Sequence, residues 1–205
     1  MSDRSAVSDA ALLRRLADES ELRDLIHRYA FGLDRHDWVL WRSIFVDEVL
    51  IDMSDFTPEP PPRRLPMERY VRSVARMFAG FDATQHFIGT HRFVIDGDTA
   101  VITAHMRAEH WLTSGQGGDR YTMYGTYTDE CVRTPDGWRL TSVTLRLLRE
   151  EGNRDVMRLA VAKGRAVMAA WEAPQTPQTP QTPQTPQTPQ TPQTPQTPQT
   201  PTDPV

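Results

Sequence analysis

Four long segments with strand character follow one another between residues 85 and 149 of this 205-residue chain, and residues typical of turns separate them. The segments are 85–95, 100–112, 120–133 and 138–149. The connections between them are Asp96-Gly97-Asp98, the glycine-rich stretch 114–118, and Pro135-Asp136-Gly137. Glycine, aspartate and proline in short connections favour tight turns between neighbouring antiparallel strands. The pattern therefore predicts an antiparallel meander.

Helical periodicity precedes the meander. Apolar residues recur at helical spacing from Leu12 to Leu33, and Ser8 is a candidate N-cap. The remaining predicted elements are a short helix at 38–46, a strand at 49–53, a proline-rich loop at 58–62, a helix at 66–79 and a last helix at 154–171. Helices followed by a meander predict an α+β fold, in which the sheet bends around the early helices and leaves a concave interior suited to a small-molecule pocket.

The C-terminal segment is a low-complexity repeat. Residues 174–200 are uninterrupted Pro-Gln-Thr triplets, and no apolar residue follows before Val205. Such a segment cannot bury enough apolar surface to offset its ordering entropy, so residues 173–205 are predicted to be a disordered tail. A spacer or a repeat expansion is the simplest interpretation, and a docking motif for a proline-binding domain is the alternative. Residues 1–8 are expected to be flexible, which leaves 9–172 as a single folded domain.

Composition excludes several kinds of partner. The net charge of −4 gives no sign of a nucleic-acid-binding surface, and no apolar run approaches the length of a membrane span. Cys131 is the only cysteine, so an internal disulfide is impossible and a reducing compartment is expected. No N-terminal signal segment is present, which favours a cytoplasmic protein. We therefore expect a small-molecule substrate and neither a nucleic-acid nor a membrane partner.

Strand parity singles out His110. The even positions of segment 100–112 are apolar except for His110, whereas the odd positions, including His105, are mostly polar or charged. Side chains alternate between the two faces of a strand, so His110 is predicted to point inward. His86 lies near the start of the preceding segment, and an antiparallel pairing could place both histidines on one concave surface. The alternative is a core histidine that a neighbouring carbonyl satisfies.

Asp34 directly follows the first predicted helix, before the chain turns toward Trp38. Its side chain could cap the next helix, a role that Asp37 could fill equally well. If Asp34 points inward instead, it would fix the tautomer of His86 and raise its basicity. These residues could also form a two-histidine, one-carboxylate metal site, but they lack the close spacing of a zinc motif, so no metal is predicted. No phosphate loop or dinucleotide fingerprint occurs, so no cofactor is predicted either.

Several motifs resemble the SnoaL-like branch of the nuclear transport factor 2-like superfamily, and within it the scytalone dehydratases. The resemblance covers roughly residues 22–153 and rests on Asp34-x-x-Asp37-Trp38, Ile51-Asp52 followed by Phe56, Thr84-Gln85-His86-Phe87-Ile88-Gly89, His110 and Gly137-Trp138. It implies a cone-shaped, curved, mostly antiparallel sheet with helices packed over its open end. It also implies assembly as a homodimer or homotrimer.

The resemblance assigns catalytic roles to Asp34, His86 and His110. In that family the histidine linked to aspartate moves protons while water leaves a cyclic ketone, without cofactor or metal. By the same resemblance, His86 would remove a proton next to a carbonyl, and a protonated histidine would assist the departure of water. The expected substrate-binding residues, taken from the resemblance and from apolar strand faces, are Leu33, Met53, Phe56, Met123, Tyr127, Asp129, Val143, Leu145 and Leu147.

This chain departs from that family's pattern where the substrate carbonyl is polarised. Leu33 and Met53 stand in place of two tyrosines, and Asp129 and Cys131 stand near a serine and an asparagine. Tyr127 or Tyr124 could take over the polarisation of the carbonyl, and Arg146 is not expected to contact substrate because its parity is opposite to that of Leu145.

Three functions therefore stay open. The first is a cofactor-independent hydro-lyase acting on a cyclic, mostly apolar substrate of the polyketide, steroid or terpenoid type. The second is an isomerase or polyketide cyclase that uses the same histidine–aspartate pair. The third is a non-catalytic module for small-molecule binding or assembly.

Overall fold

The computed structural model describes residues 8–57, 60–113 and 117–172. The predicted tail at 173–205 and the predicted flexible N-terminus, apart from Ser8, lie outside these ranges. Part of the predicted turn at 114–118 and of the proline-rich loop at 58–62 lies outside them as well.

The predicted meander is confirmed. Its strands are β3 (Ala83–Asp96), β4 (Thr99–Trp111), β5 (Arg120–Thr134) and β6 (Gly137–Gly152), each antiparallel to the next. Gly97 in the first hairpin turn and Gly137 at the end of the last one have φ angles of 57° and 95°. Only glycine adopts such angles at little cost, which explains its place in these two turns.

Two further strands extend the sheet beyond β6. β1 (Phe45–Asp52) runs parallel to β6, and β2 (Arg63–Pro66) pairs antiparallel with β1, which gives the order β2-β1-β6-β5-β4-β3. The helix predicted at 38–46 was too long, because Phe45 is buried and already pairs with Leu140 of β6. β2 was not predicted at all, since three of its four residues are exposed and an exposed edge strand shows no apolar alternation.

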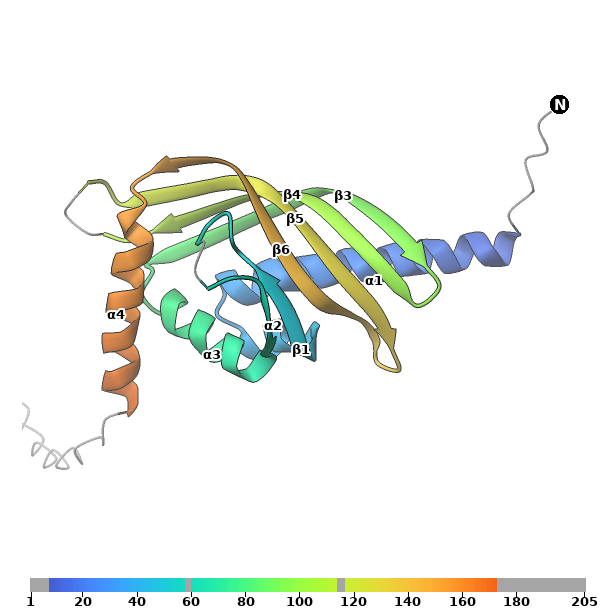
Figure 1. The fold of residues 1–205 in the computed structure, drawn as a ribbon, viewed down its shortest axis with the longest axis horizontal. Helices are drawn as coiled ribbons and strands as arrows, with labels where there is room; N and C mark the ends of the chain where they lie inside the picture. The colour runs from blue at the N-terminus through green and yellow to red at the C-terminus, as the bar shows by residue number, and fades with distance from the viewer. Residues whose placement is uncertain (1–7, 58–59, 114–116, 173–205) are drawn as a thin grey trace, which may run out of the picture. The chain divides into compact units, whose positions relative to one another are not determined.

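The sheet is strongly curved and mostly antiparallel, as expected from the family resemblance, and it does not close on itself (Figure 1). Register shifts interrupt the pairing between Gly89 and Arg92 in β3 and at two places along β5 and β6. Such irregularities bend a strand and increase its twist. At Gly125 a Cβ atom would lie 2.2 Å from the carbonyl oxygen of Arg146, so the close approach at this shift requires glycine.

Helices cover the concave side of the sheet. α1 (Asp9–Asp34) begins after Ser8, whose hydroxyl accepts a hydrogen bond from the Ala11 amide, and its second half packs on the sheet through Leu22, Leu25, Ile26, Tyr29 and Leu33 (Figure 1). α2 (Trp38–Ser43) is capped by Asp37, which accepts from the Leu40 amide at 2.9 Å. This cap leaves Asp34 available for another role. None of the helices in the described ranges combines the length and apolar character that a membrane span needs.

The remaining helices, α3 (Met67–Phe78) and α4 (Asp155–Glu172), pack against each other. Pro66 directly precedes α3, where the missing amide donor costs little. Two glycines allow a close helix–helix approach: a Cβ atom at Gly80 would lie 1.9 Å from the carbonyl oxygen of Ala160, and one at Gly164 would lie 1.8 Å from that of Arg76.

Replacing Gly164 by alanine tests this contact. The substitution G164A should lower the melting temperature, because overpacking costs about 1–3 kcal/mol and outweighs the helix propensity gained, about 1 kcal/mol. Thermal unfolding followed by circular dichroism measures the effect. G89A is the matched control, since the nearest atom to its new Cβ would lie 3.8 Å away. A G164A protein as stable as the wild type would contradict the close contact.

Candidate active site

Asp34 and His86 form a hydrogen-bonded pair between the end of α1 and the start of β3. Oδ1 of Asp34 lies 2.7 Å from Nδ1 of His86 and accepts a second hydrogen bond from the Thr84 hydroxyl at 2.9 Å. Oδ2 of Asp34 accepts a hydrogen bond from the backbone N–H of His86 at 2.8 Å. The side chains of His86 and Asp34 are only 5% and 19% exposed. One carboxylate thus positions both the backbone and the ring of His86.

The environment keeps Asp34 ionised. Burial raises the pKa of this carboxyl group, but the hydrogen bonds and charge of His86, together with Thr84, outweigh burial and lower the pKa of Asp34 overall. An ionised carboxylate can only accept hydrogen bonds, so Nδ1 of His86 must carry the proton of the neutral ring. Nε2 of His86 then holds a lone pair, which is the arrangement of a general base.

His110 of β4 lies beside this pair. The two imidazole rings are nearly perpendicular, with centroids 5.7 Å apart, and His110 is only 1% exposed. Burial, followed by the proximity of His86, lowers the pKa of His110 to about 3, so its ring is neutral at ordinary pH. Nδ1 of His110 is buried and has no hydrogen-bond partner among the described residues.

A mostly apolar cavity of about 350 Å³ adjoins both histidines. Of the residues predicted from the sequence, it is lined by His86, His110, Leu33, Met53, Phe56, Met123, Tyr127 and Leu145. Asp34 is not part of the lining, and its contacts place it behind the ring of His86. The structure therefore brings most of the predicted site residues to one enclosed space.

Three predicted substrate-binding residues do not line this cavity. Val143 is packed in the core, and Leu147 is half-buried with its amide bonded to Asp55. Asp129 is 2% exposed and accepts a long hydrogen bond of 3.4 Å from the Thr144 amide. Burial raises the pKa of Asp129 to about 8, so this carboxyl group is largely uncharged at neutral pH. Asp129 is thus a buried neighbour of the cavity wall and not part of it.

Sequence reasoning missed two tyrosines that line the cavity, Tyr29 of α1 and Tyr70 of α3. Tyr29 stands one helical turn before Leu33 on the buried face of α1, so helical spacing could have suggested it. Burial raises the pKa of Tyr29, Tyr70 and Tyr127, so their hydroxyl groups stay protonated and can donate hydrogen bonds. Tyr124, considered above as an alternative, is not in the lining, and its hydroxyl donates to Glu151 at 3.2 Å.

The helices α3 and α4 close the remaining side of the cavity. They contribute Ser73, Val74, Arg76, Met77, Phe78, Met157, Val161 and Arg165. The ring of Phe78 stacks on His86, with centroids 6.0 Å apart and planes 21° from parallel. An aromatic face therefore covers the imidazole and limits its contact with water.

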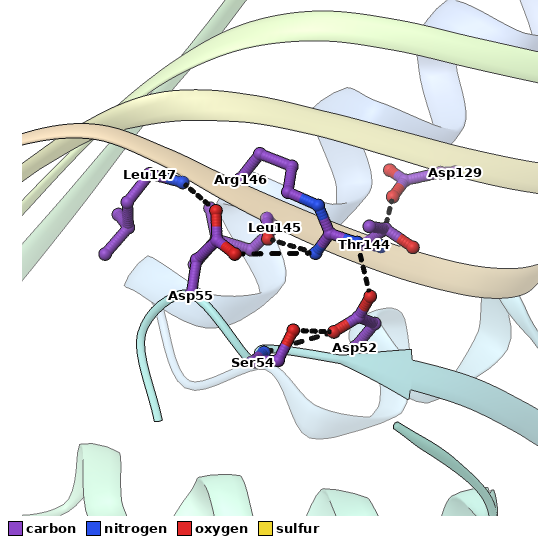
Figure 2. A network of polar contacts seen from close by, with 8 residues as sticks. All are labelled: Asp52, Ser54, Asp55, Asp129, Thr144, Leu145, Arg146 and Leu147. Carbon is purple, nitrogen blue, oxygen red and sulfur yellow. Dashed lines mark hydrogen bonds and ion pairs between the residues drawn. The ribbon is translucent and has the colours of Figure 1, made fainter. Parts of the chain in front are cut away.

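A network on β6 holds the loop that supplies Met53 and Phe56 (Figure 2). Arg146 forms an ion pair with Asp52 at 2.7 Å, and Asp55 accepts a hydrogen bond from the Leu147 amide at 3.1 Å. Hydrogen bonds from Arg146 and Ser54 lower the pKa of Asp52 to about 2, so this ion pair persists across the ordinary pH range. Arg146 is absent from the cavity lining and instead fixes the wall segment from behind.

Within the described ranges, no three histidine, cysteine, aspartate or glutamate side chains are grouped as metal ligands would be. The polar groups nearest the two histidines are the Asp34 carboxylate and hydroxyl groups of the tyrosines, and Thr57, Ser73, Arg76 and Arg165 add further polar groups to the lining. Together these groups can remove a proton from a bound molecule and donate hydrogen bonds to its oxygen atoms.

Comparison with known proteins agrees with this architecture. The sequence profile of the SnoaL-like domain matches residues 14–144. The crystal structure of protein Kfla4162 from Kribbella flavida is 39% identical, with a TM-score of 0.67, and the match covers 70% of this chain and 99% of that one. No curated protein sequence matches the chain.

More distant solved structures show the same fold. A candidate scytalone dehydratase from Novosphingobium aromaticivorans is 16% identical, with a TM-score of 0.60 over 68% of this chain and 90% of that one. The hexachlorocyclohexane dehydrochlorinase of type 3 from Novosphingobium barchaimii is 17% identical, with a TM-score of 0.57 over 69% and 94%. Since the profile match spans more than half of the chain, this protein belongs to the SnoaL-like family.

Proposed function

We propose that this protein is a cofactor-independent hydro-lyase that removes water from a cyclic, mostly apolar substrate of the polyketide, steroid or terpenoid type. The observation that carries the proposal is the 2.7 Å contact between Asp34 and His86, with the histidine on the wall of an apolar cavity. A volume of about 350 Å³ suits a small ring system. The Asp34–His86 pair supplies a general base on the cavity wall, where it would face the acidic carbon–hydrogen bond of a bound ketone.

The elimination needs only one proton carrier. Nε2 of His86 takes the proton from the carbon next to the carbonyl, and the electron pair left behind forms the new carbon–carbon double bond as the carbon–hydroxyl bond breaks. The imidazolium of His86 then returns its proton to the departing hydroxide, which leaves as water. Asp34 stabilises the imidazolium between these two steps.

His110 acts in its neutral form. Because the pKa of His110 is about 3, the protonated histidine that assists the leaving group is His86 and not His110. The buried Nδ1 of His110 has almost no accessible surface, so the neutral ring acts as part of the cavity wall beside His86. Tyr70 and the hydrogen-bonded pair of Tyr29 and Tyr127 offer hydroxyl donors for the substrate carbonyl and thus replace the tyrosines expected at Leu33 and Met53.

The names of the distant structural neighbours support an elimination. They include a candidate scytalone dehydratase and a dehydrochlorinase, and both names denote loss of a small molecule from a substrate. An isomerase or cyclase would use the same His86–Asp34 pair, and product mass separates the reactions, because only dehydration removes one water. The cytoplasmic location and the homodimer or homotrimer stay predictions, and light scattering of the purified protein tests the assembly.

Substitution of the pair tests the mechanism. On a panel of cyclic β-hydroxy ketones, including a hydroxytetralone whose dehydration yields an absorbing naphthol, H86A should lower kcat by at least roughly 10²–10⁴. D34N should lower kcat over a similar range, since an amide does not stabilise the imidazolium. H105Q is the control, because His105 is an exposed residue of β4. Full activity of a folded H86A protein would contradict the proposal.

Titration of His110 tests its neutral role. Its imidazole resonances, assigned with H110Q, should not move between about pH 8 and 5 in a carbon-13 NMR titration. Folding lowers the pKa of His110 from 6.5 to about 3, so the unfolded chain binds more protons between these values. Stability therefore falls as the pH drops below 6.5, and H110Q should show a shallower loss in denaturant titrations. A midpoint near 6.5 for His110 would contradict this account.

A further inference from the structure

Arginines gather around the cavity that holds His86 and His110. Arg76 of α3 and Arg165 of α4 belong to its lining. A second cavity of about 280 Å³ is lined in part by Arg63 and Arg69. The two cavities share the lining residues Met53, Thr57, Tyr70 and Ser73, so they adjoin each other.

No acidic side chain balances these four arginines. Within the described part of the chain, neither cavity has an aspartate or glutamate in its lining, and none of the four arginines forms a hydrogen bond or an ion pair there. Some arginines outside the two cavities are paired, as Arg133 is with Asp18 and Arg146 with Asp52, whereas others, such as Arg72, have no such partner among the described residues. In a chain with a net charge of −4, two adjoining cavities whose only formally charged lining residues are arginines are a local reversal of charge.

The packing of α3 on α4 explains why Arg76 and Arg165 come together. Gly164 lies directly against the backbone carbonyl of Arg76, and Arg165 is the next residue of α4. The two helices lie side by side at the end of the sheet where β3 begins (Figure 1). Both arginines are exposed, so they stand at the rim while the apolar residues line the interior.

We propose that the substrate is an anion, with its apolar ring inside the cavity and a carboxylate, sulfate or phosphate group bound between Arg76 and Arg165. This inference rests on the proposed function only for the position of the ring beside His86. Guanidinium groups bind such oxyanions with two parallel hydrogen bonds, and two neighbouring cations without an acidic partner repel each other until an anion binds. The same charge attracts an anionic substrate to the mouth of the cavity.

A pair of fluorescent probes tests the proposal on the full-length protein. Anilinonaphthalene sulfonate and phenylnaphthylamine share one ring system, but only the first carries an anionic group. The wild type should bind the sulfonate more tightly than the neutral probe, and added sodium chloride should reduce the difference. R76Q/R165Q should weaken binding of the sulfonate by about fivefold or more and change binding of the neutral probe by less than about twofold.

Matched variants locate the effect. R72Q/R158Q removes the same charge from the same two helices, but neither residue lines a cavity, so both probes should bind as they do to the wild type. L145W fills the cavity and should weaken both probes. H86N should keep the preference for the sulfonate while it loses activity, so failure of this inference is distinguishable from failure of the proposed function.

Several results would overturn the inference. They are equal affinities of the two probes for the wild type, an unchanged preference in R76Q/R165Q, a loss of the same size in R72Q/R158Q, and unchanged sulfonate binding by L145W. A loss of preference in R63Q/R69Q and not in R76Q/R165Q would overturn the assignment to the α3–α4 mouth, because it would place the anionic group in the second cavity.

Discussion

The Asp34 carboxylate links the helical N-terminal part of the fold to the first strand of the meander. It ends α1, and it accepts hydrogen bonds from the Thr84 hydroxyl, the His86 amide and the His86 ring at the start of β3. A partly buried charge is tolerable only when such donors satisfy it. The carboxylate that fixes the helix against the sheet therefore also fixes the orientation of the proposed base.

The curvature of the sheet creates the cavity beside the Asp34–His86 pair. A flat sheet could not enclose space on one face, whereas the register shifts in β3, β5 and β6 bend the strands around α1 and α3. The cavity is then completed by a loop after β1, which the Arg146–Asp52 pair and the Asp55–Leu147 bond hold against β6. The concave wall and its cover thus depend on different contacts.

Much of the fold could be predicted, because it follows from local patterns. Glycines in the short connections predicted the meander. The alternation of apolar and polar side chains along β4 correctly predicted that His110 lies on the buried face. The pairing of Asp34 with His86 spans 52 positions in the chain, so local patterns left it as one alternative beside helix capping, and the family resemblance was needed to favour it. β2 could not be predicted because its exposed side chains carry no pattern, and the early start of β1 is a tertiary effect of its pairing with β6. Arg76 and Arg165 come together only through the packing of two helices far apart in sequence, which no local signal records.

The loop of residues 53–57 differs from the rest of the cavity wall in how it is held. Its polar anchors are the Asp52 and Asp55 carboxylates and the carbonyl of Phe56, which Arg154 binds, so no polar anchor uses a side-chain atom of Met53 or Phe56. The ring of Phe56 adds contacts with Arg154 and Tyr121, whereas Met53 adds apolar packing alone. A substitution of Met53 therefore leaves the polar anchors of the loop and the Asp34–His86 pair in place, whereas a substitution of Phe56 also removes its ring contacts with Arg154 and Tyr121. Position 53 is thus a place on the cavity wall where one substitution changes the shape of the cavity while the anchors of its loop stay intact.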